Sequence, residues 1–343
     1  MKDNKKHKKA EYGILITGLI ILLAAACIIA LCAGQYSVSV PEVIKILASR
    51  FVNVTKTWSN TAEGVVFTLR LPRIIGAVLV GSALSLSGAA YQGVFKNPLV
   101  APDLLGVSSG ACVGASVAIL LHLNSFGVQA MAFVAGILAV GLTLFIPRLI
   151  KNTNMTMLVL SGIIVKGIMD SVMGIIKYVA DPETELQSIT YWQLGSLTKV
   201  LPKDLFTVGP VIVAASVIIF LLRWRINILS LGDREAKTLG VSVTIVRNFI
   251  IICATLLTAS AVCISGTIGW IGLVIPHFAR MLTGPDNTKA IPASILIGAI
   301  FMVVIDTLAR ALTSVELPLS ILTGIIGAPF YIIILARQRM KLS

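Results

Sequence analysis

The sequence predicts an all-α, polytopic membrane protein with about ten transmembrane helices. Of its 343 residues, 57% are hydrophobic and only 13% are charged, and the mean hydropathy is +0.95. Soluble proteins of ordinary composition do not reach such values. In addition, several runs without Lys, Arg, Asp or Glu approach or exceed the ~20 residues that a helix needs to cross a bilayer. We therefore expect one membrane domain over 1–343 and no separate soluble domain.

Eight apolar segments supply the ten spans. Leu104–Pro147 is long enough for two helices, with the polar residues His122–Ser125 as the break between them. Asn248–Ala279 is uncharged but short for two straight helices, and its glycines indicate a tilted span followed by a short or broken one. Each of the other six segments predicts one helix: Ile14–Gly34, Ile74–Phe95, Met155–Ile176, Leu205–Leu222, Ala290–Ile305 and Leu317–Ala336.

The distribution of Lys and Arg predicts the orientation. With residues 1–12 placed in the cytoplasm as a basic tail, about twice as many Lys and Arg fall on the cytoplasmic side as on the outer side. Both termini of this multi-pass protein of the cell membrane are then cytoplasmic. The net charge of +13 indicates attraction to anionic lipid rather than to nucleic acid. Ile14–Gly34 is longer than the apolar part of a signal peptide, so we treat it as a retained first span.

Two polar segments are predicted on the outer face. Gln35–Leu69 opens with Ser39 and Glu42 at the spacing of a capping box, and apolar residues at helical spacing follow. This pattern predicts an amphipathic helix at the membrane interface. Asp181–Lys203 is polar and carries the aromatic pair Tyr191–Trp192, which we expect to anchor it at the interface.

Two further segments combine helix breakers with small residues. Lys96–Asp103 contains Pro98 and Pro102, and a small-residue run follows it. Gly266–Gly272 has three glycines and precedes a Pro-His pair. Prolines end helices, and small residues let neighbouring backbones approach. Interrupted segments in both halves of a chain are common in transporters, so the pattern hints at an internal repeat.

Leu231–Val241, LGDREAKTLGV, is the most informative polar segment. It sets four charged residues between two apolar spans, and Gly240 can end the short helix that Ala236 to Leu239 favour. A surface helix between two spans suits docking onto a soluble partner. Its residues alone are equally compatible with an ordinary solvated loop. We expect a cytoplasmic loop over 223–247 around it.

Three long motifs occur in order along the chain. The first runs from Leu69–Arg73, LRLPR, to Ala111; the second is Gly266–Arg280, GTIGWIGLVIPHFAR; the third combines Glu316–Pro318 with Gly327–Pro329. Together they resemble the signatures of the FecCD family, the membrane permeases of ATP-binding cassette importers for ferric siderophores, haem and cobalamin. LGDREAKTLGV is similar to the coupling segment of that family. The resemblance covers about 69–335, implies a cobalamin-permease-like importer fold, and does not identify the ligand.

The resemblance implies a permease subunit that pairs with an identical or paralogous copy. Two ATPase subunits, which bind ATP and Mg²⁺, would attach inside, and an extracytoplasmic binding protein would deliver an iron chelate outside. We expect this chain to be no enzyme and to bind no cofactor or metal, because it has no Walker A, His-Glu-x-x-His or Cys-x-x-Cys motif. The alternatives are haem or cobalamin as substrate, or an ion-coupled carrier with Asp170 and Asp306 as its acids.

In the resembling family, arginines at the positions of Arg70, Arg73 and Arg310 pair with carboxylates of the binding protein. The resemblance therefore implies docking through these residues, and guanidinium is the better bidentate partner for a carboxylate. The alternatives are snorkelling to lipid headgroups for Arg70 and Arg73, and a salt bridge on its own helix from Arg310 to Asp306.

The resemblance also implies contacts with the ATPase in the coupling segment, for which the candidates are Gly232, Arg234, Ala236, Leu239 and Gly240. A cytoplasmic gate is expected at Asn154, Met155 and Thr156. Lys166 and Asp170 are candidates to line the pathway, because charges within a span usually face the bundle interior or water. The alternative is a structural pair in which the two neutralise each other at four-residue spacing.

Overall fold

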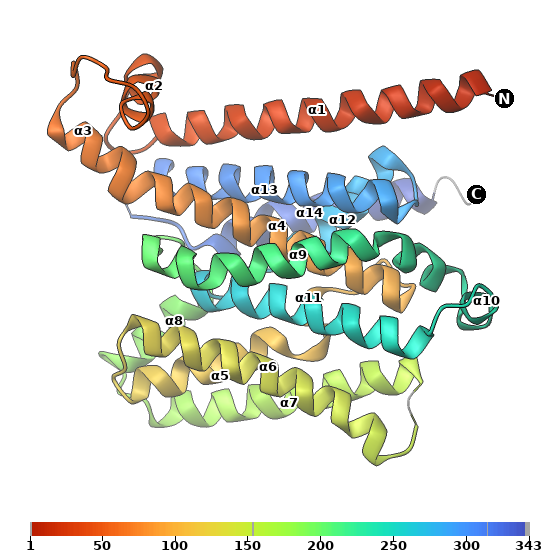
Figure 1. Ribbon diagram of the computed structural model, residues 1–343. Helices are drawn as coiled ribbons and strands as arrows, with labels where there is room; N and C mark the ends of the chain where they lie inside the picture. The colour runs from red at the N-terminus through yellow and green to blue at the C-terminus, as the bar shows by residue number, and fades with distance from the viewer. Residues whose placement is uncertain (1, 153, 314, 340–343) are drawn as a thin grey trace.

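The chain folds into a bundle of helices that run roughly along one axis (Figure 1). The computed structural model describes residues 2–152, 154–313 and 315–339, and within them every regular element is helical. Helices occupy all ten predicted spans, which confirms the all-α, ten-span prediction. Seven are long and apolar enough to cross a membrane: α1 (Lys2–Cys32), α4 (Leu71–Phe95), α6 (Ser125–Leu149), α7 (Met155–Val179), α9 (Pro202–Leu231), α11 (Val243–Ser265) and α13 (Asn287–Ala311). Three provide shorter apolar stretches: α5 (Val107–Leu120), α12 (Ile271–Thr283) and α14 (Leu319–Arg339).

We name the two ends of the bundle after the predicted orientation. The outer end holds α2 (Val40–Ala48), α3 (Asn60–Gly64) and α8 (Glu185–Leu194). The inner end holds α10 (Asp233–Thr238) and the start of α1 (Figure 1). Residues 2–12, predicted as a basic tail, continue α1 as helix, and residue 1 lies outside the described residues.

The helix that leads into α4 begins well before the predicted span. α3, a π-helical turn at Val65–Arg70 and α4 run on without interruption for 36 residues. The wide turn precedes Pro72, which has no N–H for a regular helical bond. The Leu71 N–H instead donates to the carbonyl oxygen of Val66, five residues back. The predicted outer segment therefore ends in helix, and this helix carries Arg70 at its outer end.

The outer end departs from the prediction in two respects. α2 forms with Val43 and Ile46 buried, as expected for an amphipathic helix, but the Ser39 side chain makes no cap bond. Pro41 in the first turn already removes one of the N–H groups that a cap would satisfy. In the second outer segment an unpredicted helix, α8, forms because Ile189 is buried against α5 and its neighbours.

Helices α4 and α11 form the centre of the bundle, and α12 and α13 pack on α4. Glycines allow two of these contacts. A methyl group at Gly88 would overlap the carbonyl oxygen of Gly272 in α12, and one at Gly81 would overlap that of Gly298 in α13. Because the backbones themselves are in contact there, α4 fixes the positions of both helices.

The two interrupted segments lie against each other. The chain leaves α4 at Lys96, turns back through the short 3-10 helix η2 (Pro102–Leu105) and then begins α5. The ring of Pro102 packs on Gly272, at the start of α12. The Gln92 side-chain amide donates to the carbonyl oxygens of Val100 (3.2 Å) and Gly272 (3.3 Å), which joins both segments to α4. The internal repeat itself stays a prediction.

Candidate functional site

Arg70 and Arg310 cap the C-terminal end of α1 by donating hydrogen bonds to its backbone carbonyls. The carbonyl oxygens that accept from them are those of Leu31 (2.6 Å), Cys32 (3.2 Å) and Tyr36 for Arg70, and of Ala33 (2.7 Å) and Ala30 for Arg310. The last carbonyls of a helix have no partner within it, and a cation there also complements the negative end of the helix dipole. The two side chains therefore tie α1 to the starts and ends of later helices.

Arg73 is the centre of a buried ionic network. Its Nε lies 2.9 Å from Asp306 on α13, and its Nη1 lies 2.8 Å from Glu316 in the α13–α14 connection. Thr198 Oγ1 also donates to Glu316, at 2.6 Å. Although partial burial raises the pKa of Glu316, the hydrogen bonds from Arg73 and Thr198 outweigh it, so the pKa lies below its usual value. Arg310 approaches Asp306 at 3.7 Å, which is the salt bridge considered as an alternative.

The structure brings the three predicted docking arginines together at the outer end, but it buries them. Arg70, Arg73 and Arg310 are 6%, 8% and 7% exposed. Their guanidiniums therefore do not extend to lipid headgroups, and their donors face groups of this chain. Docking through these residues stays a prediction. A partner at this end would meet a buried network rather than three free cations.

The coupling segment forms the short surface helix α10 at the inner end. Arg234, Leu239 and Gly240 are exposed and available to a partner. Ala236 differs from the expectation: it is fully buried where α10 packs on α9 and α11. It therefore anchors α10 rather than contacting a partner. Gly232 leads into α10 with a positive φ of 146°, a conformation that favours glycine.

Asp233 ties α10 to two other elements. Its carboxylate accepts from Arg247 Nη2 on α11 at 2.7 and 2.9 Å and from Lys96 Nζ at 3.1 Å. The hydrogen bonds from Arg247, and more weakly from Lys96, hold the pKa of Asp233 below its usual value. Because a lowered carboxyl pKa contributes stability above its unfolded value, the tie is intact at neutral pH and weakens only in acid.

The predicted gate and pathway residues lie along α7. Asn154 caps α7 through its side chain, which accepts from the Met157 N–H at 2.8 Å; Asn154 and Thr156 are exposed and Met155 is half-buried. Lys166 and Asp170 are both exposed near the middle of the helix. Lys166 forms its ion pair with Asp103 of η2, at 3.2 Å, rather than with Asp170, the partner considered as the alternative.

Three acidic residues of these sites were missed from the sequence: Asp103, Asp233 and Glu316. A signal existed for Asp103, because it is the only Asp or Glu between Glu63 and Asp170. It was therefore one of only two acids near Lys166 along the chain. Glu316 pairs with Arg73, and Asp233 pairs with the distant Lys96 and with Arg247 on the next helix. Spacing along one helix does not reveal such partners.

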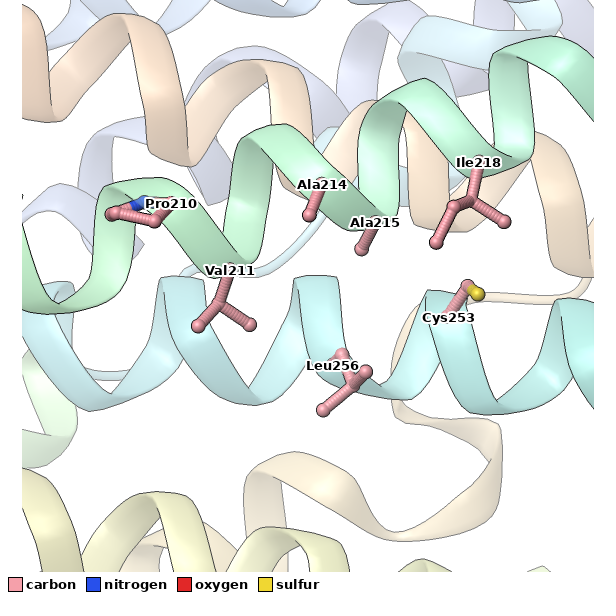
Figure 2. A pocket seen from close by; sticks show the side chains of 7 residues that line it. All are labelled: Pro210, Val211, Ala214, Ala215, Ile218, Cys253 and Leu256. Carbon is pink, nitrogen blue, oxygen red and sulfur yellow. The ribbon is translucent and has the colours of Figure 1, made fainter.

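An apolar cavity lies between the two long helices α9 and α11. It has a volume of about 360 Å³ and is lined by residues of α9 and α11 (Figure 2). Its lining residues are Pro210, Val211, Ala214, Ala215, Ile218, Cys253 and Leu256. It contains no charged side chain, so its lining suits apolar groups rather than a polar or charged cargo.

The chain belongs to the FecCD transport family, whose pattern it matches over residues 22–337. It is 37% identical over 322 residues to the molybdate import system permease protein MolB of Haemophilus influenzae, covering 94% of this chain and 95% of that protein. It is 40% identical over 275 residues to an iron chelatin transport system permease protein of Helicobacter pylori, covering 80% and 83%. A solved metal-chelate type ABC transporter in an inward-facing conformation superposes with a TM-score of 0.85 at 35% identity, covering 95% and 99%.

These likenesses give the class of the protein. It is the permease component of an ATP-binding cassette importer, a multi-pass protein of the cytoplasmic membrane and a transport component rather than an enzyme. Permeases of this kind work with an ATPase and a substrate-binding protein. The alternative of an ion-coupled carrier is therefore set aside.

Proposed function

We propose that this chain and a second permease copy form the membrane pathway of an importer for a ferric siderophore. The observation that carries the proposal is the α7 stripe, a row of exposed charged and small residues made of Lys166, Gly167, Asp170, Ser171 and Gly174. Charges within a span are costly in hydrocarbon and usually face water or another protein surface. A lipid-facing role would not place this stripe in the middle of α7.

A second copy of the chain would cover the α7 stripe. A methyl group at Gly167 or at Gly174 would meet nothing within 4 Å in this chain, so another helix can approach closely there. Most oligomers are symmetric, and a twofold axis beside α7 places two stripes on opposite sides of one pathway. The same geometry holds for an identical or a paralogous second copy.

The charges on the stripe support a chelate over a small oxyanion. Lys166 is paired with Asp103 at 3.2 Å, and Asp170 adds a second carboxylate, so the stripe has no excess of positive charge. An oxyanion such as molybdate is usually held by converging cations or N–H groups. Haem and cobalamin, which are also large, remain the alternatives to a ferric siderophore.

The exposed part of α10 supports docking of an ATPase at the inner end, one on each permease copy. In this proposal ATP and Mg²⁺ are bound by those partners, and this chain binds no cofactor. A binding protein docks at the outer end, near Arg70, Arg73 and Arg310. Asn154, Met155 and Thr156, at the inner end of α7, form the cytoplasmic gate of the pathway.

Uptake by the reconstituted importer tests the substrate. The permease, its ATPase and its binding protein are placed in liposomes, and four probes are compared: iron-55 ferrichrome, haem, cyanocobalamin and molybdate. We expect ATP-dependent uptake of ferrichrome that persists with an uncoupler present, because no ion gradient is used. Uptake of molybdate alone would contradict the chelate assignment, and uptake abolished by the uncoupler would contradict the ATP-driven mechanism.

Thiol labelling in intact cells tests the orientation. In a background without the five native cysteines, which all lie in apolar segments, Asn60→Cys and Glu185→Cys are expected to react with a membrane-impermeant reagent. Glu235→Cys, at the other end of the bundle, is expected to stay unlabelled until the cells are opened, because the basic loops face the cytoplasm. Labelling of Glu235→Cys from outside would invert the assignment of inner and outer ends.

A further inference from the structure

We propose that Lys96–Asp103, the segment that runs from the end of α4 into η2, is a tie that transmits movement of α10 to the pathway helix α7. The proposal rests on the function proposed above, in which α10 receives the ATPase and α7 lines the pathway. It adds coupling residues outside the predicted sites: Lys96 and Asp103 on this segment, and Asp233 on α10. These act by positioning other groups and do not themselves touch the substrate.

The inner end of the tie is held by α10. Lys96 Nζ donates to the Asp233 carboxylate at 3.1 Å, and the same carboxylate accepts from Arg247 on α11. Lys96 itself ends α4 with a left-handed backbone, φ 53°. A displacement of α10 by a docked partner would therefore act directly on the residue where the tie leaves α4.

The far end of the tie is held by α7. Asp103 Oδ2 lies 3.2 Å from Lys166 Nζ, and Asp103 Oδ1 accepts from the Ser108 N–H at 3.1 Å. Leu104, the next residue, also packs on α7. Its carbonyl oxygen lies so close to Gly162 that a methyl group at Gly162 would overlap it. Asp103 therefore links the end of the tie to α5 and to the α7 stripe together.

The tie is short and stiff between these two ends. Seven residue steps separate Lys96 from Asp103, which is about 25 Å at full extension. Pro98 and Pro102 fix two of the backbone angles, and the Leu99 N–H donates to the Asn97 side chain at 2.9 Å. A cavity of about 130 Å³ beside Lys96, Asn97 and Pro98 leaves room for the inner end to move.

The packing of the helices makes this tie a direct route. α10 packs on α9 and α11, whereas α7 packs on α5, α6 and η2. α11 also packs directly on α5 and α6, and the path from Asp233 through Lys96 and Asp103 to Lys166 joins the two groups through two ion pairs. Breaking either pair should leave ATP hydrolysis running and reduce the amount of substrate moved for each ATP.

The experiment uses the reconstituted importer and iron-55 ferrichrome, with ATP hydrolysis and uptake measured on the same liposomes. We expect Lys96→Gln and Asp103→Asn each to lower uptake per ATP by up to about fivefold, the equivalent of the roughly 1 kcal/mol that a partly exposed ion pair contributes. Hydrolysis should stay within about twofold. Lys96→Arg and Asp103→Glu, which keep the charge, should restore the ratio. The control is Lys56→Gln, which breaks an ion pair to Glu63 of 2.8 Å at the outer end and should leave the ratio unchanged.

The double variant shows whether the two ion pairs act in one route or affect transport independently. If both pairs belong to one route, Lys96→Gln/Asp103→Asn should be no worse than the stronger single variant. Multiplied defects, an unchanged ratio in the single variants, or loss of ATPase co-purification in Lys96→Gln would each overturn the tie. Absence of ATP-driven ferrichrome uptake by the unmodified importer would instead count against the proposed function. In that case the tie is tested without substrate, by measuring whether ATP hydrolysis changes the thiol labelling of Ile163→Cys on α7.

Discussion

Replacing Asp306 with Ala is expected to lower the free energy of unfolding by about 3–5 kcal/mol, because removing one member of a buried ion pair leaves the other charge uncompensated. Asp306 is 1% exposed and receives Arg73 at 2.9 Å. The measurement is the heat-induced loss of the monodisperse species of the purified permease in detergent. The destabilised variant should melt earlier than the wild type and reach a lower level in the membrane.

Glu316→Gln is the matched control for this variant. Glu316 contacts the same guanidinium, but its side chain is 37% exposed, so an ion pair there is worth at most about 1 kcal/mol. We expect only a small change in melting temperature. Equal melting temperatures for Asp306→Ala and the wild type would show that the network does not hold the outer end together.

The same network decides how docking through the arginines must be tested. Because Arg70, Arg73 and Arg310 are buried, reversing their charge disturbs folding as well as any contact with a partner. Arg73→Lys keeps the charge and loses the planar fork. A docking role predicts weaker affinity of the binding protein per folded complex, with the loss shrinking as salt rises. A structural role alone predicts a lower melting temperature with unchanged affinity.

Replacing Ala236 with Phe is expected to reduce uptake by about fivefold or more, since overpacking costs about 1–3 kcal/mol and 1.4 kcal/mol is a factor of ten. Ala236 is fully buried where α10 meets α9 and α11, so the larger ring displaces α10 as a unit. The bundle itself does not depend on this contact, and the protein should stay in the membrane at its normal level. Co-purification of the ATPase and uptake per folded permease are the measurements.

Two further variants sharpen this test. Ala236→Ser fits nearly the same volume and should retain most activity. Gly240→Leu puts a bulky residue at a position with φ 75°, where the backbone conformation favours glycine, and should resemble the Phe variant. Undiminished assembly and uptake in both Ala236→Phe and Gly240→Leu would remove α10 from the interface.

Hydropathy was sufficient for the spans because the length of an apolar run is a direct physical requirement of the bilayer. It missed α8, whose sequence is polar and whose stability comes from Ile189 packed against another element. It also placed the start of the second span at Ile74, because nothing in an apolar count reveals a helix that continues outward through a π-helical turn.

The sites were predicted less completely, because the spacing of residues along the chain indicates only contacts within one helix. Four-residue spacing offered Asp170 as one candidate partner for Lys166, whereas the chain folds back after α4 and places Asp103 beside Lys166. The arginines posed a different problem. Several of their acceptors are backbone carbonyls at the end of α1, and a carbonyl leaves no mark in a sequence.

The capping of α1 has a consequence for the order in which the protein is made. α1 is the first helix to leave the ribosome, yet the donor for the carbonyls of Ala30 and Ala33 is Arg310, which is synthesised about 280 residues later. Arg70 arrives early and can satisfy Leu31 and Cys32 as soon as the second span enters the membrane. The carbonyl groups at the end of α1 therefore gain all their hydrogen bonds only after the ninth span, α13, has been made. Assembly of the outer end is thus a late event of biosynthesis, and a chain truncated before Arg310 keeps its first span incompletely closed.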